Sequence, residues 1–278
     1  MGFPNAQLIL KRTTGLSAFK LLILSAQASR PRMKFVWDFI LQPFVNDDQI
    51  ALTYRESNRT LQMSLRLADR SSDLHSVLEV LIRNVYALDP AYAADLVIDG
   101  GANIGLFSLQ AAAVYPNARI IACEPLPRNI EQLKKHLTCN QVTVDVLPIC
   151  LGGAERTIPF YCRGANASSF DAATPYDEIL SIRVMTLKNI MKMQATEKVL
   201  IKLDIEGMEI EVLEDFVPKE MGCVIVVGEL HGHQENCGKL ETLFAEHGWS
   251  FRMGDLSGYD AMFEARSPAA SKHLSQSS

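Results

Sequence analysis

Apolar runs of strand length alternate with amphipathic segments of helical length through the middle of the chain. An apolar run without polar alternation is typical of a strand covered on both faces, as in a parallel sheet. Such runs fall at residues 96–98, 119–123, 142–150, 199–204 and 223–227. The pattern predicts an α/β fold around a doubly wound, mostly parallel sheet, which residues 249–253 and 260–264 close as a final pair of strands.

The N-terminal part of the chain has a different pattern. Residues 1–45 predict helices that break near Pro31 and Pro43, because proline cannot continue a helix. Residues 50–55 and 60–67 then alternate in polarity around a short polar link, which predicts a β-hairpin.

These patterns divide the chain into three parts. Residues 1–70 are expected to form a helical and hairpin extension that serves as a lid, a dimerisation element or a substrate rim. Residues 71–265 form the main domain, which opens with a helix from Asp73. Residues 266–278 are rich in Ser, Ala and Lys and are expected to be a disordered tail. The apolar stripe of the first helix comprises Leu74, Val77, Leu78, Leu81 and Val85.

Composition narrows the class of function. The formal net charge is -5 and the sequence pI is about 5.7, so the chain lacks the basic field that sequence-independent nucleic-acid binding needs. The charge therefore argues against a nucleic-acid substrate. No apolar run approaches the ~20 residues that span a bilayer. The six cysteines form no C-x-x-C pair, which favours free thiols in a reducing compartment and predicts a cytoplasmic protein.

A glycine turn at residues 100–105 follows the first strand of the sheet directly. Missing side chains in such a turn let the backbone approach a ligand at the start of the next helix. Glu124 comes about 20 residues later at the tip of the neighbouring strand, where a carboxylate can accept hydrogen bonds from both ribose hydroxyls. The stretch from Asp95 to Pro125 therefore predicts a nucleoside-binding βαβ unit.

Two nucleoside ligands compete for this unit. A dinucleotide site needs a second glycine for its pyrophosphate, and Ala102 occupies that position here. The sequence also lacks a Tyr-x-x-x-Lys pair that would support a nicotinamide-dependent oxidoreductase. The turn DGGANIG instead resembles the first motif of class I S-adenosylmethionine-dependent methyltransferases. Two further alternatives are a turn whose glycines serve the fold alone and a catalytically inactive nucleoside-binding module.

A second set of polar residues follows two other strands of the same sheet. Asp204 and Glu206 come after one strand, and Glu229 and His231 come after the next. Ligands of open α/β sheets bind at the carboxyl ends of the strands, so these side chains face the crevice that holds Glu124. His231 is the expected general base, oriented by Glu229 or Asp204 and mostly neutral at pH 7.

Other chemistry remains open for this set. The acidic side chains can bind the acceptor hydroxyl or the donor's amino group, cap the following helix, or hold a divalent cation such as magnesium together with His231. The cation is the second choice, and the sequence does not settle whether a metal is present.

Three blocks of sequence together resemble the FkbM family of S-adenosylmethionine-dependent O-methyltransferases. They are VIDGGANIGLFSL, ACEPLPRNIEQLKKHL, and the pair IKLDIEGMEIEVL with VVGELHG. The resemblance covers roughly residues 71–265, and the IKLDIEGxE block is its most specific part. It implies the class I methyltransferase fold, a Rossmann-like sheet of seven strands, and methylation of a hydroxyl on a sugar, glycolipid or polyketide-type natural product.

The resemblance and the spacing together give a set of expected site residues. The catalytic residues are His231, Asp204 and Glu229. The cofactor-binding residues are Asp99, Gly100, Gly101, Ala102, Asn103, Gly105, Glu124, Pro125, Asn129, Leu151 and Asp204. The substrate-binding residues are Glu206, Ser168 and Ser169, the two serines lying in the polar loop 163–177. The expected partner is a small-molecule or glycan acceptor, and a homodimer is compatible with the extension.

Overall fold

The structure is a computed structural model, which describes residues 8–10, 49–57, 59–66, 70–163, 167–169, 178–192, 198–217, 222–254 and 261–275. Most of the extension expected at residues 1–45 lies outside these ranges, including the helix breaks at Pro31 and Pro43. Most of the expected substrate rim within residues 163–177 lies outside them too.

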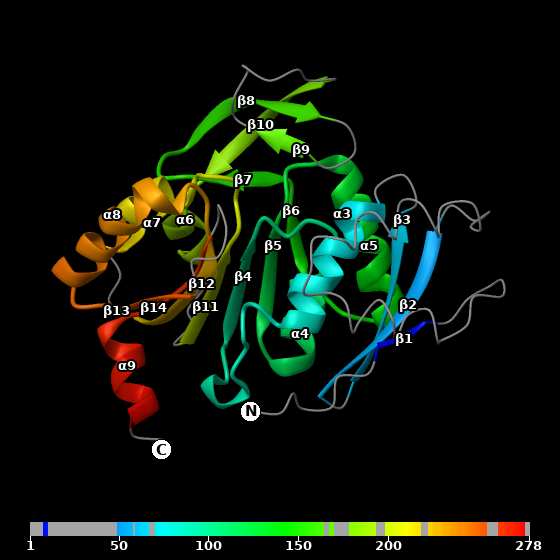
Figure 1. Cartoon of the computed structure of the whole chain (residues 1–278), viewed down its shortest axis with the longest axis horizontal. Helices are drawn as coiled ribbons and strands as arrows, with labels where there is room; N and C mark the ends of the chain where they lie inside the picture. Colours follow the sequence, from blue (N-terminus) through cyan, green and yellow to red (C-terminus); the bar gives the residue numbers. More distant parts are fainter. Residues whose placement is uncertain are drawn as a thin grey trace.

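Seven strands form the central sheet (Figure 1). In spatial order they are β13 (Ser250–Met253), β14 (Ala261–Arg266), β12 (Cys223–Leu230), β11 (Lys198–Leu203), β4 (Leu96–Gly100), β5 (Arg119–Cys123) and β6 (Asp145–Leu147). The pairs from β12 to β6 are parallel, whereas β14 runs antiparallel to both of its neighbours. The sheet confirms the predicted mostly parallel class I methyltransferase fold.

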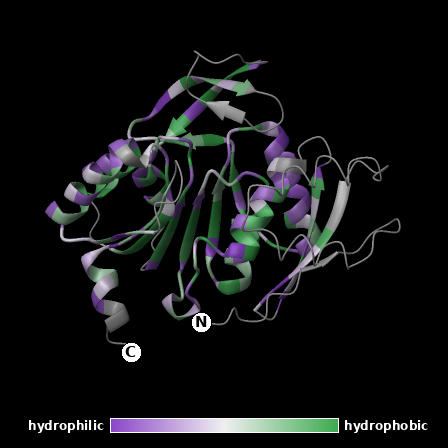
Figure 2. Cartoon of the chain, in the orientation of Figure 1, coloured by the Kyte–Doolittle hydropathy of each residue, from purple (hydrophilic) through white to green (hydrophobic). Residues whose placement is uncertain are grey.

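Helices cover both faces of this sheet, which is why its inner strands β12, β11, β4 and β5 are largely apolar without alternation (Figure 2). On β4, Leu96 and Ile98 belong to the core shared with α6, α7 and α8, whereas Val97 belongs to the core shared with α4 and α9. The helices are α4 (Leu106–Val114), α5 (Pro127–Asn140), α6 (Leu187–Met191), α7 (Glu209–Phe216), α8 (His233–Glu246) and α9 (Pro268–Ser275).

The predicted hairpin is confirmed as β2 (Gln49–Glu56) and β3 (Arg59–Arg66). Its inward residues share one hydrophobic core with α4 and α5, including Leu52 and Leu65 beside Leu109 and Leu133. The helical expectation for residues 1–45 is wrong where the structure describes them, because β1 (Leu8–Leu10) pairs antiparallel with β2. Pairing with the free edge of the hairpin outweighs the helical pattern of that short stretch.

The helix expected from Asp73 begins earlier and changes its winding. It runs as α3 (Arg70–Ser76) and continues as the π-helix η3 (Val77–Arg83). Val77 and Leu81 are buried in the core with the hairpin, as their stripe predicts. Asn84 ends the helix in a left-handed conformation with φ of 49°.

The strand expected at residues 142–150 is divided by Pro148, which has no N–H to give to a ladder. Residues before it form β6 in the central sheet, and residues after it form β7 (Ile149–Leu151) in a second sheet. That sheet has the order β7-β10-β8-β9 and lies beyond the upper end of the central sheet in Figure 1. Its other strands are β8 (Arg156–Arg163), β9 (Ala167–Ser169) and β10 (Glu178–Met185).

The expected disordered tail is wrong for residues 268–275, which form α9. Ser267 Oγ accepts a hydrogen bond from the N–H of Ala270 at 3.2 Å, and Pro268 follows it as a residue well suited to the first turn. Ala270 is fully buried in the core between α9 and the sheet. A capped helix with a buried face is therefore stable despite its polar composition.

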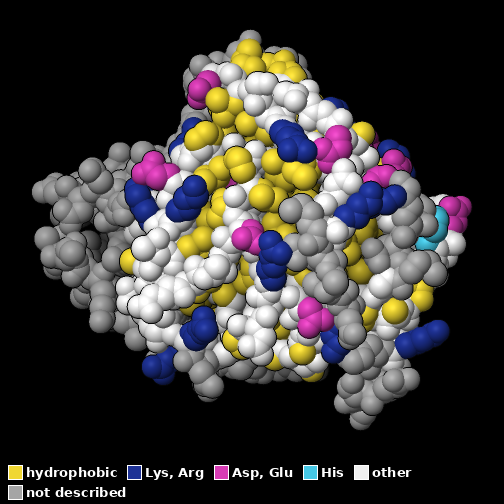
Figure 3. Space-filling model, turned by 180° about the vertical axis from the view of Figure 1, so that it is seen from behind, with side chains coloured by type: hydrophobic (Ala, Val, Ile, Leu, Met, Phe, Trp, Pro, Cys, Tyr) yellow, Lys and Arg dark blue, Asp and Glu magenta, His cyan; other side chains and the backbone are white. Residues whose placement is uncertain are grey.

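No helix among the described residues has the length and hydrophobicity needed to cross a membrane. Figure 3 shows charged side chains of both signs scattered around hydrophobic ones on the rear face of the molecule.

Candidate active site

The glycine turn between β4 and α4 is tightly wound. Gly101 and Gly105 have φ values of +74° and +83°, in the region where only glycine is unstrained. A Cβ atom on Gly101 would collide with the backbone carbonyl oxygen of Asp204. Gly101 therefore makes room for the backbone that follows β11. The sequence predicts only the approach of a ligand as the reason for a glycine here, and the structure adds this packing reason.

Glu124 follows β5 and is 4% exposed. Its Oε2 accepts a hydrogen bond from Asn103 N at 2.8 Å, and its Oε1 accepts from Leu126 N at 3.0 Å and from Asn129 Nδ2 at 3.2 Å. Burial raises the pKa of Glu124, and these donors offset part of the rise. A carboxylate oxygen has two lone pairs, so Oε2 retains capacity for a further donor.

A pocket opens beside this carboxylate at the carboxyl ends of the strands. Seven of the expected cofactor-binding residues line it: Gly101, Asn103, Glu124, Pro125, Asn129, Leu151 and Asp204. Glu206 lines it as well, and Cys150 and Phe160 form part of its apolar wall. The structure thus brings the glycine turn, the acidic strand tip and the second acidic pair to one cavity, as the topology predicts.

A second, smaller pocket adjoins the first. It shares Gly101, Asn103 and Asp204 with it and is also lined by Ala102 and Tyr86. Three other expected cofactor residues line neither of these two pockets, namely Asp99, Gly100 and Gly105.

Asp99 and Lys202 form a buried ion pair beneath the turn. Lys202 Nζ lies 3.4 Å from Asp99 Oδ1 and 3.7 Å from Asp204 Oδ2, and it donates to two carbonyl oxygens of the glycine turn at 3.1 and 2.7 Å. Burial lowers the pKa of Lys202, but the Asp99 and Asp204 carboxylates outweigh it and raise the pKa above its ordinary value. The charged ammonium of Lys202 therefore links the glycine turn to Asp204.

His231 lies at the carboxyl end of β12 among three carboxylates. Its Nδ1 lies 2.9 Å from Glu209 Oε1, and its Nε2 lies 3.7 Å from Glu206 Oε2 and 4.0 Å from Asp204 Oδ1. Glu209 is the first residue of α7 and is fully buried. Its Oε1 also accepts from the N–H groups of Ile205 and Gly207, so the loop after β11 fixes the partner of the histidine.

This environment changes the expected charge of the histidine. Burial lowers the pKa of His231, but the hydrogen bond and charge of Glu209, with the charges of Asp204 and Glu206, outweigh it and raise the pKa to about 9. The expectation of a mostly neutral imidazole at pH 7 is therefore wrong for this structure. The residue that orients Nδ1 is Glu209, not Glu229 or Asp204 as the sequence predicts.

Glu209→Gln is expected to bring the pKa of His231 down from about 9 toward or below its ordinary value, because it removes the charge while keeping the shape. A raised folded-state pKa stabilises the fold below the unfolded value of about 6.5, and that stability is lost as pH rises through about 9. NMR titration of the His231 ring in both proteins measures the shift. An unchanged pKa in the variant would contradict the pairing.

Asp204, Glu229 and His231 offer ligand atoms that all lie within 4.8 Å of one another. Asp204 Oδ2 also accepts a hydrogen bond from Tyr86 at 3.0 Å. Burial and the nearby Asp204 raise the pKa of Tyr86 well above its ordinary value, so the phenol remains a donor. The expected catalytic trio is therefore assembled, with Tyr86 as an unpredicted neighbour.

The expected substrate residues are less fully placed. Glu206 has a left-handed φ of 58° and a 61% exposed side chain at the rim of the pocket. Ser168 and Ser169 lie in β9 opposite Cys162 and Tyr161 of β8, and their side chains are outside what the structure describes.

The sequence matches the family described as "Methyltransferase FkbM domain" over residues 99–251. Among curated proteins, AMB antimetabolite synthetase AmbE of Pseudomonas aeruginosa is 39% identical over 84 residues, which are 30% of this chain and 4% of that protein. Methyltransferase sdnD of Sordaria araneosa is 34% identical over 83 residues, 29% of this chain and 32% of that protein. Methyltransferase 1 of Beauveria bassiana is 24% identical over 197 residues, 62% of this chain and 79% of that protein.

A solved structure of an FkbM methyltransferase from Methylobacillus flagellatus KT aligns with a TM-score of 0.45 and 16% identity, covering 63% of this chain and 44% of that one. The chain spans well under two thirds of the length of AmbE and of sdnD. The family match, by contrast, includes the glycine turn, Glu124 and His231 and extends over more than half of the sequence. This chain belongs to the FkbM methyltransferase family.

Proposed function

We propose that this methyltransferase moves a methyl group from S-adenosylmethionine to a hydroxyl of a small molecule or glycan. The observation that carries the proposal is the pocket that the buried Glu124 carboxylate shares with Asp204 and Glu206, whose carboxylate oxygens lie 4.0 and 3.7 Å from Nε2 of His231. A nucleoside would be held on one side and a proton removed on the other.

The residues of the pocket fit S-adenosylmethionine. Glu124 Oε2 retains a lone pair for a ribose hydroxyl, and Leu151 and Phe160 offer apolar wall for a planar base. Asn103 Oδ1 is buried without a hydrogen-bond partner among the described residues, and Asp204, whose side chain is 30% exposed, lines the same pocket. Both are acceptors suited to the ammonium of the methionine moiety.

When bound, S-adenosylmethionine supplies an electrophilic methyl carbon on a sulfonium. The chain must align the acceptor oxygen with that carbon and remove the proton of an alcohol that does not ionise at neutral pH. Orientation contributes about 7–11 kcal/mol, and a positioned base contributes about 100- to 10,000-fold in rate. We assign the proton to Nε2 of His231, with Asp204 and Glu229 as the surrounding charges.

Glu209 selects this atom. Its carboxylate holds the proton on Nδ1, so the neutral imidazole presents a lone pair at Nε2. Because the pKa of His231 is about 9, the neutral form is the minority at pH 7. Activity should therefore rise from pH 7 toward pH 9.

The acceptor would enter over the rim formed by Glu206. This carboxylate can accept a hydrogen bond from a hydroxyl. Ser168 and Ser169 of β9 are the other substrate-binding candidates, on the basis of the sequence. A sugar, glycolipid or polyketide-type product offers such hydroxyls.

A divalent cation held by Asp204, Glu229 and His231 is the second mechanism. Three ligand atoms within 4.8 Å of one another would suit it. The Lys202 ammonium lies 3.7 Å from Asp204, however, and the ammonium of S-adenosylmethionine is assigned to the same carboxylate. Repulsion among these positive charges favours the metal-free base.

Glu124→Ala is expected to weaken the binding of S-adenosylhomocysteine about tenfold or more, because it removes a charged acceptor from the ribose hydroxyls. Calorimetric titration measures the change. Glu131→Ala is the control, since Glu131 has a 71% exposed side chain on the neighbouring α5. Equal affinity in the two variants would refute the role of Glu124.

The proposed reaction is tested by incubating the full chain with methyl-labelled S-adenosylmethionine and a panel of hydroxylated sugars, glycolipids and polyketides, with and without chelator. Label transferred to oxygen in the presence of chelator supports the metal-free mechanism. Transfer that chelator abolishes and magnesium restores would support the cation instead. An inactive nucleoside-binding module would bind the cofactor without transfer to any acceptor.

A further inference from the structure

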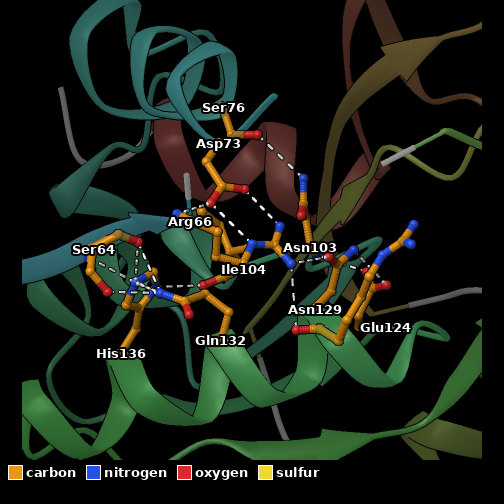
Figure 4. A network of polar contacts seen from close by, with 11 residues as sticks. Ser64, Arg66, Asp73, Ser76, Asn103, Ile104, Glu124, Asn129, Gln132 and His136 are labelled. Carbon is orange, nitrogen blue, oxygen red and sulfur yellow. Dashed lines mark hydrogen bonds and ion pairs between the residues drawn. The ribbon is translucent and has the colours of Figure 1, made fainter. Parts of the chain in front are cut away.

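The N-terminal hairpin reaches the cofactor pocket through buried side chains (Figure 4). Arg66, the last residue of β3, donates from Nη1 to Asn129 Oδ1 at 3.0 Å. Asn129 in turn donates from Nδ2 to Glu124 Oε1 at 3.2 Å. Two consecutive side-chain contacts thus join the hairpin to the carboxylate of the pocket.

We propose that Arg66 is a positioning residue for Glu124, so that the hairpin forms part of the cofactor site. The inference rests on the proposed function, in which Glu124 binds the ribose of the cofactor. Arg66 does not line the pocket that Glu124 and Asn129 line, and it acts on the ligand only through them.

Arg66 is itself held rigidly. Its Nη2 lies 2.7 Å from Asp73 Oδ1 and its Nε lies 3.1 Å from Asp73 Oδ2, a two-pronged ion pair. Asp73 Oδ2 also accepts from the backbone N–H of Arg66 at 2.8 Å. The side chain of Asp73 is 1% exposed and that of Arg66 13% exposed, so solvent screens the pair little. The guanidinium therefore presents Nη1 to Asn129 in a fixed direction.

This direction fixes the orientation of the Asn129 amide. Arginine can only donate and an ionised carboxylate can only accept, so the amide oxygen must face Arg66 and the amide nitrogen must face Glu124. Without Arg66 the amide can turn over and place its oxygen against Glu124 Oε1. The two oxygens would repel each other and displace the carboxylate from the pocket.

A second group of hydrogen bonds joins the hairpin to α5 and to the glycine turn. His136 Nε2 contacts the backbone N–H and carbonyl of Ser64 at 3.0 and 3.1 Å, and its Nδ1 contacts the carbonyl oxygen of Ile104 at 2.8 Å. Gln132 also donates to the carbonyl oxygen of Ser64 at 2.9 Å. The hairpin, α5 and the glycine turn are therefore locked together where Arg66 acts.

The test compares S-adenosylhomocysteine with its analogue that has a 2′,3′-dideoxyribose, titrated by calorimetry into the full chain. The ratio of the two affinities reports the hydrogen bonds to Glu124 and is insensitive to an unfolded fraction. The variants are Arg66→Met and Asn129→Leu, the second of which leaves the Arg66–Asp73 pair in place. Asn140→Ala is the matched control, because Asn140 joins the same hairpin and helix through two hydrogen bonds to the Gln62 backbone.

Wild type is expected to prefer the ribose compound about tenfold or more. Both variants should reduce that preference several-fold. Asn140→Ala should lower thermal stability but leave the preference for the ribose compound unchanged. A preference unchanged in Asn129→Leu, or in folded Arg66→Met, would overturn the inference while leaving the proposed function intact. Wild type that binds neither compound, or binds both equally, would overturn the ribose assignment and this inference with it.

Discussion

His231→Ala is expected to lower turnover about 100-fold or more while leaving the affinity for S-adenosylmethionine nearly intact. The loss follows because a positioned base contributes about 100- to 10,000-fold, whereas the cofactor pocket is lined by other residues. Initial rates at saturating substrates measure the effect. His247→Ala serves as the control, since His247 lies at the C-terminal end of α8, lines neither pocket, and has its Nδ1 2.8 Å from the carbonyl oxygen of Leu243.

The pH profile separates catalysis from packing. If Nε2 of His231 takes the proton, kcat/KM of the wild type rises about tenfold per pH unit up to the pKa of about 9. The residual activity of His231→Ala should lack that slope. Near-normal turnover in the variant, or the same slope in both proteins, would exclude His231 as the base.

Gly101→Ala is expected to destabilise the fold strongly. The new Cβ would meet the carbonyl oxygen of Asp204, which is backbone and cannot rotate away, and φ of +74° is strained for alanine. Overpacking costs about 1–3 kcal/mol and the left-handed conformation about 1–2 kcal/mol. The melting temperature should fall by about 5–15 °C, which differential scanning calorimetry measures.

Gly248→Ala is the matched control for this substitution. Gly248 has φ of +71°, but a Cβ there would lie 3.7 Å from Pro268 Cγ, at ordinary contact distance. It therefore carries the backbone strain without the collision, and its melting temperature should fall much less. Equal falls in melting temperature would mean that the Asp204 backbone moves aside. The need for a glycine at position 101 would then come from the ligand and not from packing.

The central sheet could be predicted from the sequence because each buried strand is a short apolar run with a helix on either side. The carboxyl ends of such strands lie at one edge, so Glu124, Asp204 and His231 could be placed in one crevice before their distances were known. Local features were harder. Pro148 separates the last two residues of one expected strand, which join another sheet, and a serine cap begins α9 in a stretch of disordered composition.

The partners of the site residues could not be predicted, because they come from distant parts of the chain. Glu209 stands 22 residues before His231, and only the loop after β11 aims its carboxylate at Nδ1. Arg66 stands 63 residues before Asn129 and belongs to the hairpin, where alternation indicates only a strand. The raised pKa of His231 follows from such contacts and has no signal in the local sequence.

Separate calorimetric titrations of S-adenosylmethionine and NAD into the full chain test the central claim most directly. Binding of S-adenosylmethionine to one site, with no heat from NAD, is the predicted result, because Ala102 and the Glu124 pocket suit a nucleoside without a pyrophosphate. Saturable binding of NAD without binding of S-adenosylmethionine would contradict it.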